Sequence, residues 1–177
     1  WIVVKDTATT RFVGYTELEA EANVIKYRRV TSKGKDLYQI ALDVTPFYAE
    51  SGGQIGDEGE LIFPNERVRI SDTKKEDGLT IHFAETLPEN ISAPLVAKVN
   101  GSKRLLTTVH HSATHLMHAA LREVLGTHVA QKGSLVNEEH LRFDFSHFAG
   151  VTHDELRKVE QIVNRKIREN VPVVIRE

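Results

Sequence analysis

The stretch PLVAKVNGSKRLLTTVHHSATHLMHAALREVLG, residues 94–126, changes its hydrophobic period in the middle. Up to residue 100 it is rich in Val and typical of a strand. From Ser102 to Leu125 the apolar residues recur every three or four positions, which predicts an amphipathic helix. Asn100 or Ser102 can cap the start of this helix, and Gly126 can end it. We therefore expect two domains, residues 1–98 and residues 99–177.

The segment before this boundary is typical of β structure. Short runs rich in Val, Ile, Tyr and Phe alternate with turn residues such as Asp77-Gly78 and Pro88-Glu89-Asn90. Closely spaced short strands predict a small antiparallel barrel or sandwich, and we expect the barrel. The expected strands are residues 21–30, 36–47, 59–64, 67–72, 79–85 and 94–100.

The segment after the helix predicts a hairpin, a second helix and a strand. THVAQKGSLV and EHLRFDFSHF are typical of paired strands, and Thr152 with Glu155 has the spacing of a capping box. The helix it opens runs to the break at Pro172, and the final VPVVIRE is typical of a strand that has just begun. The fold class expected for the whole chain is α+β, a barrel followed by a partial α/β two-layer core.

Composition narrows the possible environment and partners. The chain contains no Cys, its net charge is −2, and it holds no apolar run long enough to span a membrane. The first 98 residues carry 12 Lys and Arg against 16 Asp and Glu, whereas the remainder carries 11 against 9. We expect a cytoplasmic protein with no membrane partner and no DNA partner. The first residue is Trp and the last residues are apolar, so both ends are interpreted as cuts in a longer protein.

Four histidines fall within nine positions of the predicted helix. His111 and His115 are four residues apart and therefore share one helix face, whereas His118 is too far from His111 to bind the same ion. Ser112 stands where a zinc peptidase of the H-E-x-x-H type carries Glu, which argues against that class. Spacing alone leaves two interpretations open. One is a metal-binding pair, either His111 with His115 or His115 with His118, and the other is a set of partly buried or surface histidines of an ordinary amphipathic helix.

The second unusual segment is TPFYAESGGQIGDEGEL, residues 45–61, with four glycines in eight positions. The simpler interpretation is a loop between strands that requires positive φ angles. The tripeptide Gly52-Gly53-Gln54 also occurs at the loop tip of release-factor-type peptidyl-tRNA hydrolases. The acidic surroundings of the tripeptide here, including Glu50 and Asp57, argue against that function.

The motifs together resemble one family. FYAESGGQIGDEG, followed by HHSATHLMHAALREVLGTHVAQKGS and LRFDFSH, is similar to the editing region of alanyl-tRNA synthetases and to free-standing hydrolases of mischarged alanine tRNA. The similarity extends over essentially the whole chain, in the same order.

The resemblance implies roles for four residues. His111 and His115 match the zinc-binding H-x-x-x-H pair, and Thr114 and Gln131 match residues of the editing pocket. The family completes its zinc site with a C-x-x-x-H pair further downstream, which this chain does not include. The resemblance therefore implies half of a zinc site here, and it places ATP and magnesium only in an aminoacylation domain outside this chain.

The implied activity is hydrolysis of Ser-tRNA(Ala) or Gly-tRNA(Ala) in a zinc-centred pocket of an alanine–tRNA ligase. The alternative is a non-catalytic module that binds tRNA or docks other domains, and this fragment alone is expected to be inactive. The expected partners are the acceptor end of tRNA(Ala) and the other domains of the synthetase. Basic residues that can meet its phosphates are Lys26, Arg28, Arg29, Lys132, Arg165 and Lys166.

Overall fold

The computed structural model describes residues 1–6, 9–32 and 34–172. The chain divides within its first helix into two compact units, Trp1–Leu105 and Leu106–Glu177. Each unit has its own apolar core. No helix in the described part of the chain is both long and apolar enough to cross a bilayer.

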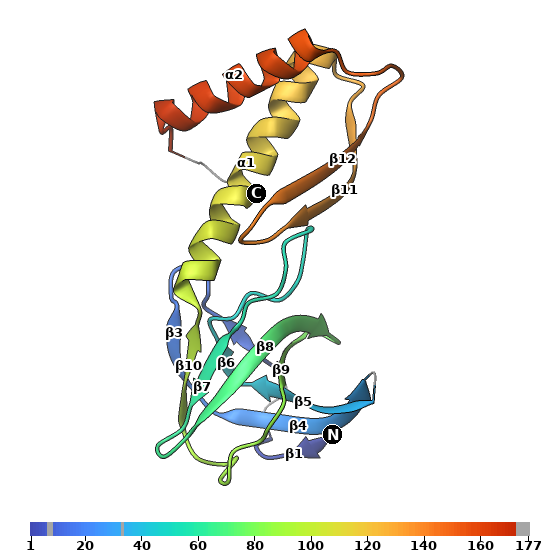
Figure 1. Cartoon of the computed structure of the whole chain (residues 1–177). Helices are drawn as coiled ribbons and strands as arrows, with labels where there is room; N and C mark the ends of the chain where they lie inside the picture. Colours follow the sequence, from blue (N-terminus) through green and yellow to red (C-terminus); the bar gives the residue numbers. More distant parts are fainter. Residues whose placement is uncertain (7–8, 33, 173–177) are drawn as a thin grey trace. The chain divides into compact units, whose positions relative to one another are not determined.

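The first unit is built on an antiparallel sheet in which the spatial order of the strands differs from their order in the chain. The described strands follow the order β1-β4-β5-β9-β8-β7-β10-β3 (Figure 1). The order does not close, because no pairing joins β1 to β3 among the described residues. A short parallel pair, β2 with β6, accompanies the sheet. The strands are β1 Ile2–Val3, β2 Arg11–Phe12, β3 Glu19–Ala22, β4 Val24–Ser32, β5 Lys35–Leu42, β6 Val44–Thr45, β7 Gly59–Ile62, β8 Arg67–Glu76, β9 Leu79–Ala84 and β10 Leu95–Val99.

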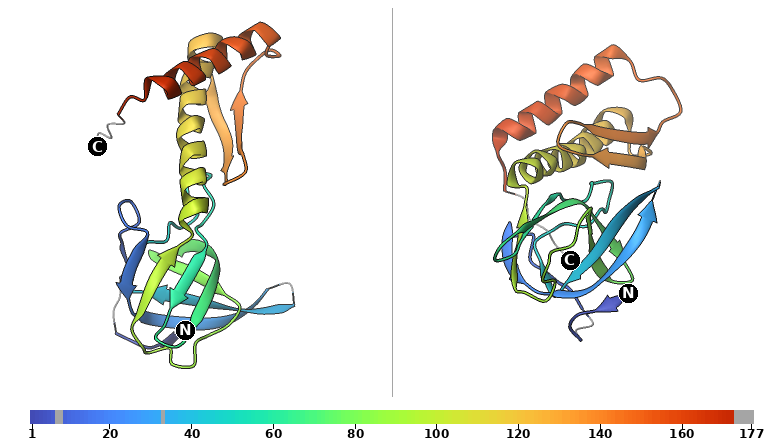
Figure 2. Two further views of the ribbon diagram at one scale, coloured as in Figure 1. Left: turned by 60° about the vertical axis from the view of Figure 1, so that its left-hand side comes forward. Right: turned by 60° about the horizontal axis from the view of Figure 1, so that its bottom comes forward.

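Most of these strands lie in the segments that the alternating pattern predicted, but β1 and β2 lie outside them, and the expected strands 21–30 and 36–47 are each divided in two. β8 has the burial pattern of a strand with one covered face: Val68 and Ile70 are buried, whereas Arg67 and Arg69 are exposed. The sheet curls around an apolar core (Figure 2) whose fully buried members include Ile40, Leu42, Phe47, Leu61 and Ile70. Burial of these side chains is the main favourable contribution to folding of this unit.

The turn predicted at Asp77-Gly78 is confirmed. Both residues have positive φ angles, 47° and 80°, and they join β8 to β9 where Glu76 pairs with Leu79. Two left-handed residues between paired strands form a turn that matches the right-handed twist of a hairpin. The turn therefore fixes the register of these two strands.

The second unit contains most of α1 Gly101–Leu125, the hairpin of β11 Ala130–Val136 and β12 Leu141–Ser146, and α2 His153–Glu169. The hairpin lies beside α1, and α2 crosses the C-terminal half of α1 (Figures 1 and 2). Leu121, Val129 and Val159 are buried where these elements meet, with Phe143 and Phe145 of the hairpin packed against them. The pattern that predicted one apolar face on this hairpin is confirmed.

Caps define both helices as the sequence predicted. The Asn100 side chain accepts a hydrogen bond from the Lys103 amide (3.2 Å), so Asn100 rather than Ser102 caps α1. Thr152 and Glu155 form the complete capping box of α2, and Asn170 ends that helix in a left-handed conformation. The mixed α+β class is therefore confirmed. The strand expected near the end of the chain falls largely on residues 173–177, which lie outside the described residues.

Candidate functional site

The H-x-x-x-H pair lies on one face of α1. The His111 and His115 rings are stacked, with centroids 5.1 Å apart and planes inclined by 12°. Zinc is bound by imidazole nitrogens, and these two rings are neighbours on the helix. The helix thus presents the two side chains together, as their spacing predicted.

The environment of His111 disfavours the charged form of its imidazole. Partial burial and, secondarily, the charge of the neighbouring His115 lower the pKa of His111 below its ordinary value. Neutral imidazole is the form that binds a metal ion. His115 is exposed and lines a largely apolar groove of about 740 Å³ between α1 and α2, beside Ser112, Leu116 and Ile167.

The pair fits part of a zinc site. Among the described residues, no group of three or more His, Cys, Asp or Glu side chains is placed to hold a metal ion. A zinc ion takes four protein ligands, or three ligands and a water. His111 and His115 fit two of these positions, and the described part of the chain supplies no third.

Thr114 and Gln131 occupy different environments. Thr114 is buried, with 7% of its surface exposed, and its hydroxyl donates to the His110 carbonyl (2.8 Å). Gln131 is exposed on β11, where it pairs with Phe145 just before a bulge. No hydrogen bond joins the Gln131 side chain to Thr114 or to either histidine in the described structure. Thr114 is therefore held in place, whereas Gln131 is exposed.

The other two helix histidines have structural roles that the sequence did not reveal. His110 Nδ1 lies 2.7 Å from the carbonyl oxygen of Asn137, so this ring ties α1 to the turn of the hairpin. The His118 ring packs against Phe143, and its Nε2 is buried without a hydrogen-bond partner in the described residues. Local spacing carries no signal for these roles, because both contacts are with residues distant in sequence.

The glycine-rich segment is a tightly held loop. Ser51 and Gln54 pair through their backbones, while Gly52 and Gly53 adopt positive φ angles of 61° and 83°. Gln54 is buried, with 5% of its surface exposed. A Cβ at Gly56 would lie 2.0 Å from the Thr73 carbonyl oxygen, so only glycine fits there. This geometry argues against a flexible GGQ tip that enters a reaction centre.

Arg104 in the first turn of α1 holds the same loop. Its guanidinium donates to the Asp57 carboxylate and to the carbonyls of Gly14 (2.6 Å) and Pro46 (2.9 Å). The two charged side chains are only 13% and 7% exposed. Asp57 also accepts from the Tyr48 amide (2.7 Å). No local sequence pattern predicts this cluster, because its members are separated by up to 90 residues.

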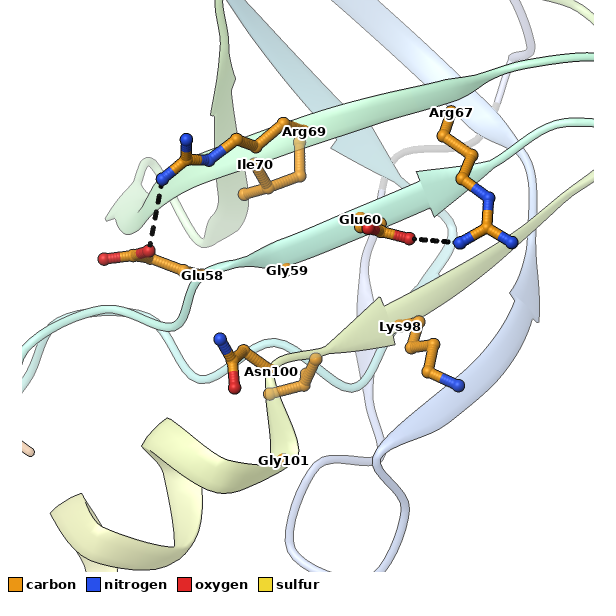
Figure 3. Close-up of a pocket in the computed structure, with 10 residues that line it drawn as sticks. Glu58, Gly59, Glu60, Arg67, Arg69, Ile70, Lys98, Asn100 and Gly101 are labelled. Carbon is orange, nitrogen blue, oxygen red and sulfur yellow. Dashed lines mark hydrogen bonds and ion pairs between the residues drawn. The ribbon is translucent and has the colours of Figure 1, made fainter.

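A second groove, of about 540 Å³, lies on the first unit where β7, β8 and β10 meet the start of α1 (Figure 3). Four of its charged side chains pair with one another: Arg67 with Glu60 (3.0 Å) and Arg69 with Glu58 (3.8 Å). The fifth, Lys98, pairs with Glu19, which does not line the groove. Exposed ion pairs of this kind contribute little to stability. The groove does not concentrate any of the predicted site residues.

Most of the basic residues predicted to contact phosphates interact with other side chains of this chain. Lys26 and Arg28 lie over the Trp1 ring, 4.6 and 4.3 Å from its centroid, and Arg29 pairs with Asp36. Lys132 is exposed on β11. Arg165 and Lys166 both pair with Glu169, and Lys166 also lines the groove beside His115. Lys26, Arg28 and Arg29 belong to the first unit, and Lys132, Arg165 and Lys166 to the second.

Comparison with known proteins assigns the chain to a class. Residues 2–102, the sheet and the start of α1, match the family described as tRNA synthetases class II (A). Since this match covers more than half of the chain, the chain belongs to that family of aminoacyl-tRNA synthetases.

The individual relatives are alanine–tRNA ligases. The chain is 57% identical to those of Cytophaga hutchinsonii over 171 residues and of Bacteroides fragilis over 173 residues, which is 97% and 98% of its length. It is 48% identical to that of Porphyromonas gingivalis over 169 residues. The chain spans about a fifth of the length of these relatives. The resemblance to alanyl-tRNA synthetases inferred from the motifs is confirmed, and the similarity extends through both units.

Proposed function

We propose that the chain forms the editing region of an alanine–tRNA ligase, which hydrolyses Ser-tRNA(Ala) or Gly-tRNA(Ala). The observation that carries the proposal is the stacked pair of His111 and His115, whose ring centroids are 5.1 Å apart and of which His115 lines a groove. The names of the relatives support the ligase assignment. ATP and magnesium belong, in this proposal, to an aminoacylation part of the ligase outside this chain.

The reaction is hydrolysis of an ester. Water adds to the aminoacyl carbonyl carbon, the bond to the ribose oxygen breaks, and that oxygen takes up a proton as the amino acid leaves. Zinc, when bound, supplies a Lewis acid that polarises an oxygen or lowers the pKa of water.

In this proposal the chain's own residues bind the zinc and orient the aminoacyl group. His111 and His115 contribute two neutral imidazoles to the zinc. Thr114 is rigid because its hydroxyl donates to the His110 carbonyl, so its oxygen is a fixed acceptor. Gln131 is solvent-facing and can donate or accept on the aminoacyl group. A serine hydroxyl offers such groups one hydrogen bond more than the methyl group of alanine, which is a basis for discrimination.

A second candidate function is a non-catalytic module that binds tRNA or docks other domains. The observation that favours it is the absence of a third metal donor among the described residues. Both candidates are tested by measuring zinc content and Ser-tRNA(Ala) deacylation for this chain and for a protein extended through the next C-x-x-x-H pair. We expect only the longer protein to hold zinc tightly and to deacylate. If the longer protein binds tRNA(Ala) without zinc and without hydrolysis, the non-catalytic function is correct.

A further inference from the structure

An aromatic cluster on the second unit is separate from the histidine pair of α1. Phe148 follows β12 and is 84% exposed, although it is a large apolar side chain. Its ring centroid lies 4.7 Å from those of both His128 and His147, with planes inclined by 35°. The two imidazoles are themselves stacked and joined by a hydrogen bond of 2.8 Å between His128 Nε2 and His147 Nδ1.

The local backbone builds this cluster. Gly126 has a φ of 116°, and a Cβ there would lie 2.9 Å from His128 Nδ1, so glycine makes room for the imidazole. His147 comes directly after β12 and before the capping box of α2. The Phe148 ring thus contacts two imidazoles that are joined to each other, while most of its surface is exposed to solvent.

We propose that Phe148, supported by His128 and His147, is a stacking platform for an unpaired base of RNA. The proposal rests on the proposed function, in which tRNA is the partner. Proteins bind unpaired RNA bases by stacking them on Phe, Tyr, Trp or His rings. Such stacking needs one open ring face, and it tolerates any base because every base has a π face.

The surroundings favour a base over a phosphate. The Glu155 carboxylate accepts hydrogen bonds from the Thr152 amide and hydroxyl. These bonds lower the pKa of Glu155, and the electrostatic effect of His147 lowers it further by a smaller amount. A fixed negative charge beside His147 repels a phosphate, whereas it does not oppose a neutral base.

The surroundings also favour a base over an apolar protein partner. The residues that follow Phe148, Ala149 and Gly150, are exposed and add little apolar area. Protein docking sites are contiguous apolar patches, and here the exposed apolar group is a single ring.

The test uses this chain and a short single-stranded oligoribonucleotide that carries 2-aminopurine, whose fluorescence is quenched by stacking. We expect Phe148→Ala to weaken binding about tenfold and to abolish the quenching. Phe148→Tyr keeps a ring and is expected to keep both. Leu156→Ala, which removes another exposed apolar side chain of the same unit, is the matched control and is expected to change neither. Circular dichroism of each variant checks that the fold is retained.

Three results would overturn the platform: no quenching with the wild-type chain, equal affinity of Phe148→Ala and wild type, or an equal loss in Leu156→Ala, which indicates a general apolar docking surface. Failure of the proposed function is recognised separately, by zinc content and deacylation in the longer protein. If the longer protein neither holds zinc nor deacylates while quenching depends on Phe148, only the proposed editing function is wrong. If the longer protein holds zinc and deacylates while Phe148→Ala binds RNA normally, only the proposed stacking platform is wrong.

Discussion

His82 shows how one buried side chain makes stability depend on pH. It has no exposed surface, its Nε2 lies 2.7 Å from Thr45 Oγ1, and its Nδ1 lies 2.9 Å from the Ile40 carbonyl oxygen. Burial lowers the pKa of His82 from 6.5 to about 4. In the unfolded chain His82 is therefore protonated as the pH falls below 6.5, whereas in the folded chain it stays neutral until the pH reaches about 4.

From this difference we predict that the free energy of unfolding falls by about 2 kcal/mol between pH 7 and pH 5 through His82 alone. Urea unfolding at the two pH values measures it. In His82→Gln, which cannot titrate, we expect a correspondingly smaller fall. The exposed His140→Gln is the control and should keep the wild-type pH dependence. An unchanged pH dependence in His82→Gln would show that His82 is not the group responsible.

Arg104 and Asp57 form the most buried ion pair described, and we predict a large effect when it is broken. Arg104→Met leaves the Asp57 carboxylate buried without its partner, which costs about 3–5 kcal/mol of unfolding free energy. Arg67→Met removes a pair whose side chains are 68% and 43% exposed, and it should cost less than about 1 kcal/mol. Denaturant melts of both variants measure the contrast. Equal costs would mean that the Arg104 cluster contributes no more than a surface pair.

At the scale of elements, α2 depends on its cap. Thr152 Oγ1 accepts from the Glu155 amide (3.3 Å), so Thr152→Ala leaves a helix N–H without its partner. We predict a loss of about 1 kcal/mol in the stability of the second unit, measured by thermal unfolding. Ser102→Ala is the control, because Asn100 caps α1 and Ser102 is exposed. A cost in Ser102→Ala as large as in Thr152→Ala would contradict the assignment of these caps.

Elements were the features best predicted from the sequence, because their signals are local. Period, caps and the Asp77-Gly78 turn each depend on residues within a few positions of one another. The order of the strands in the sheet and the Arg104 cluster depend on residues far apart in the chain, and no local pattern encodes them. The same holds at the candidate site. Spacing placed His111 beside His115, but it could not show that His110 holds the hairpin turn.

At the scale of the whole molecule, the family match and the candidate site residues lie in different units. The family match covers the first unit and the start of α1, whereas the histidine pair, Thr114 and Gln131 lie in the second. The relatives extend the similarity through both units but are about five times longer than this chain. The proposed zinc site therefore depends on what a longer protein adds to the two imidazoles of α1.

The central claim, that His111 and His115 are half of the zinc site of an editing esterase, is tested most directly in the protein extended through the C-x-x-x-H pair. Zinc content and Ser-tRNA(Ala) deacylation are measured for the wild type, for His111→Ala and for the control His140→Ala. We predict one zinc and rapid deacylation in the wild type and in the control, and loss of both in His111→Ala. Full activity with zinc retained in His111→Ala would contradict the claim.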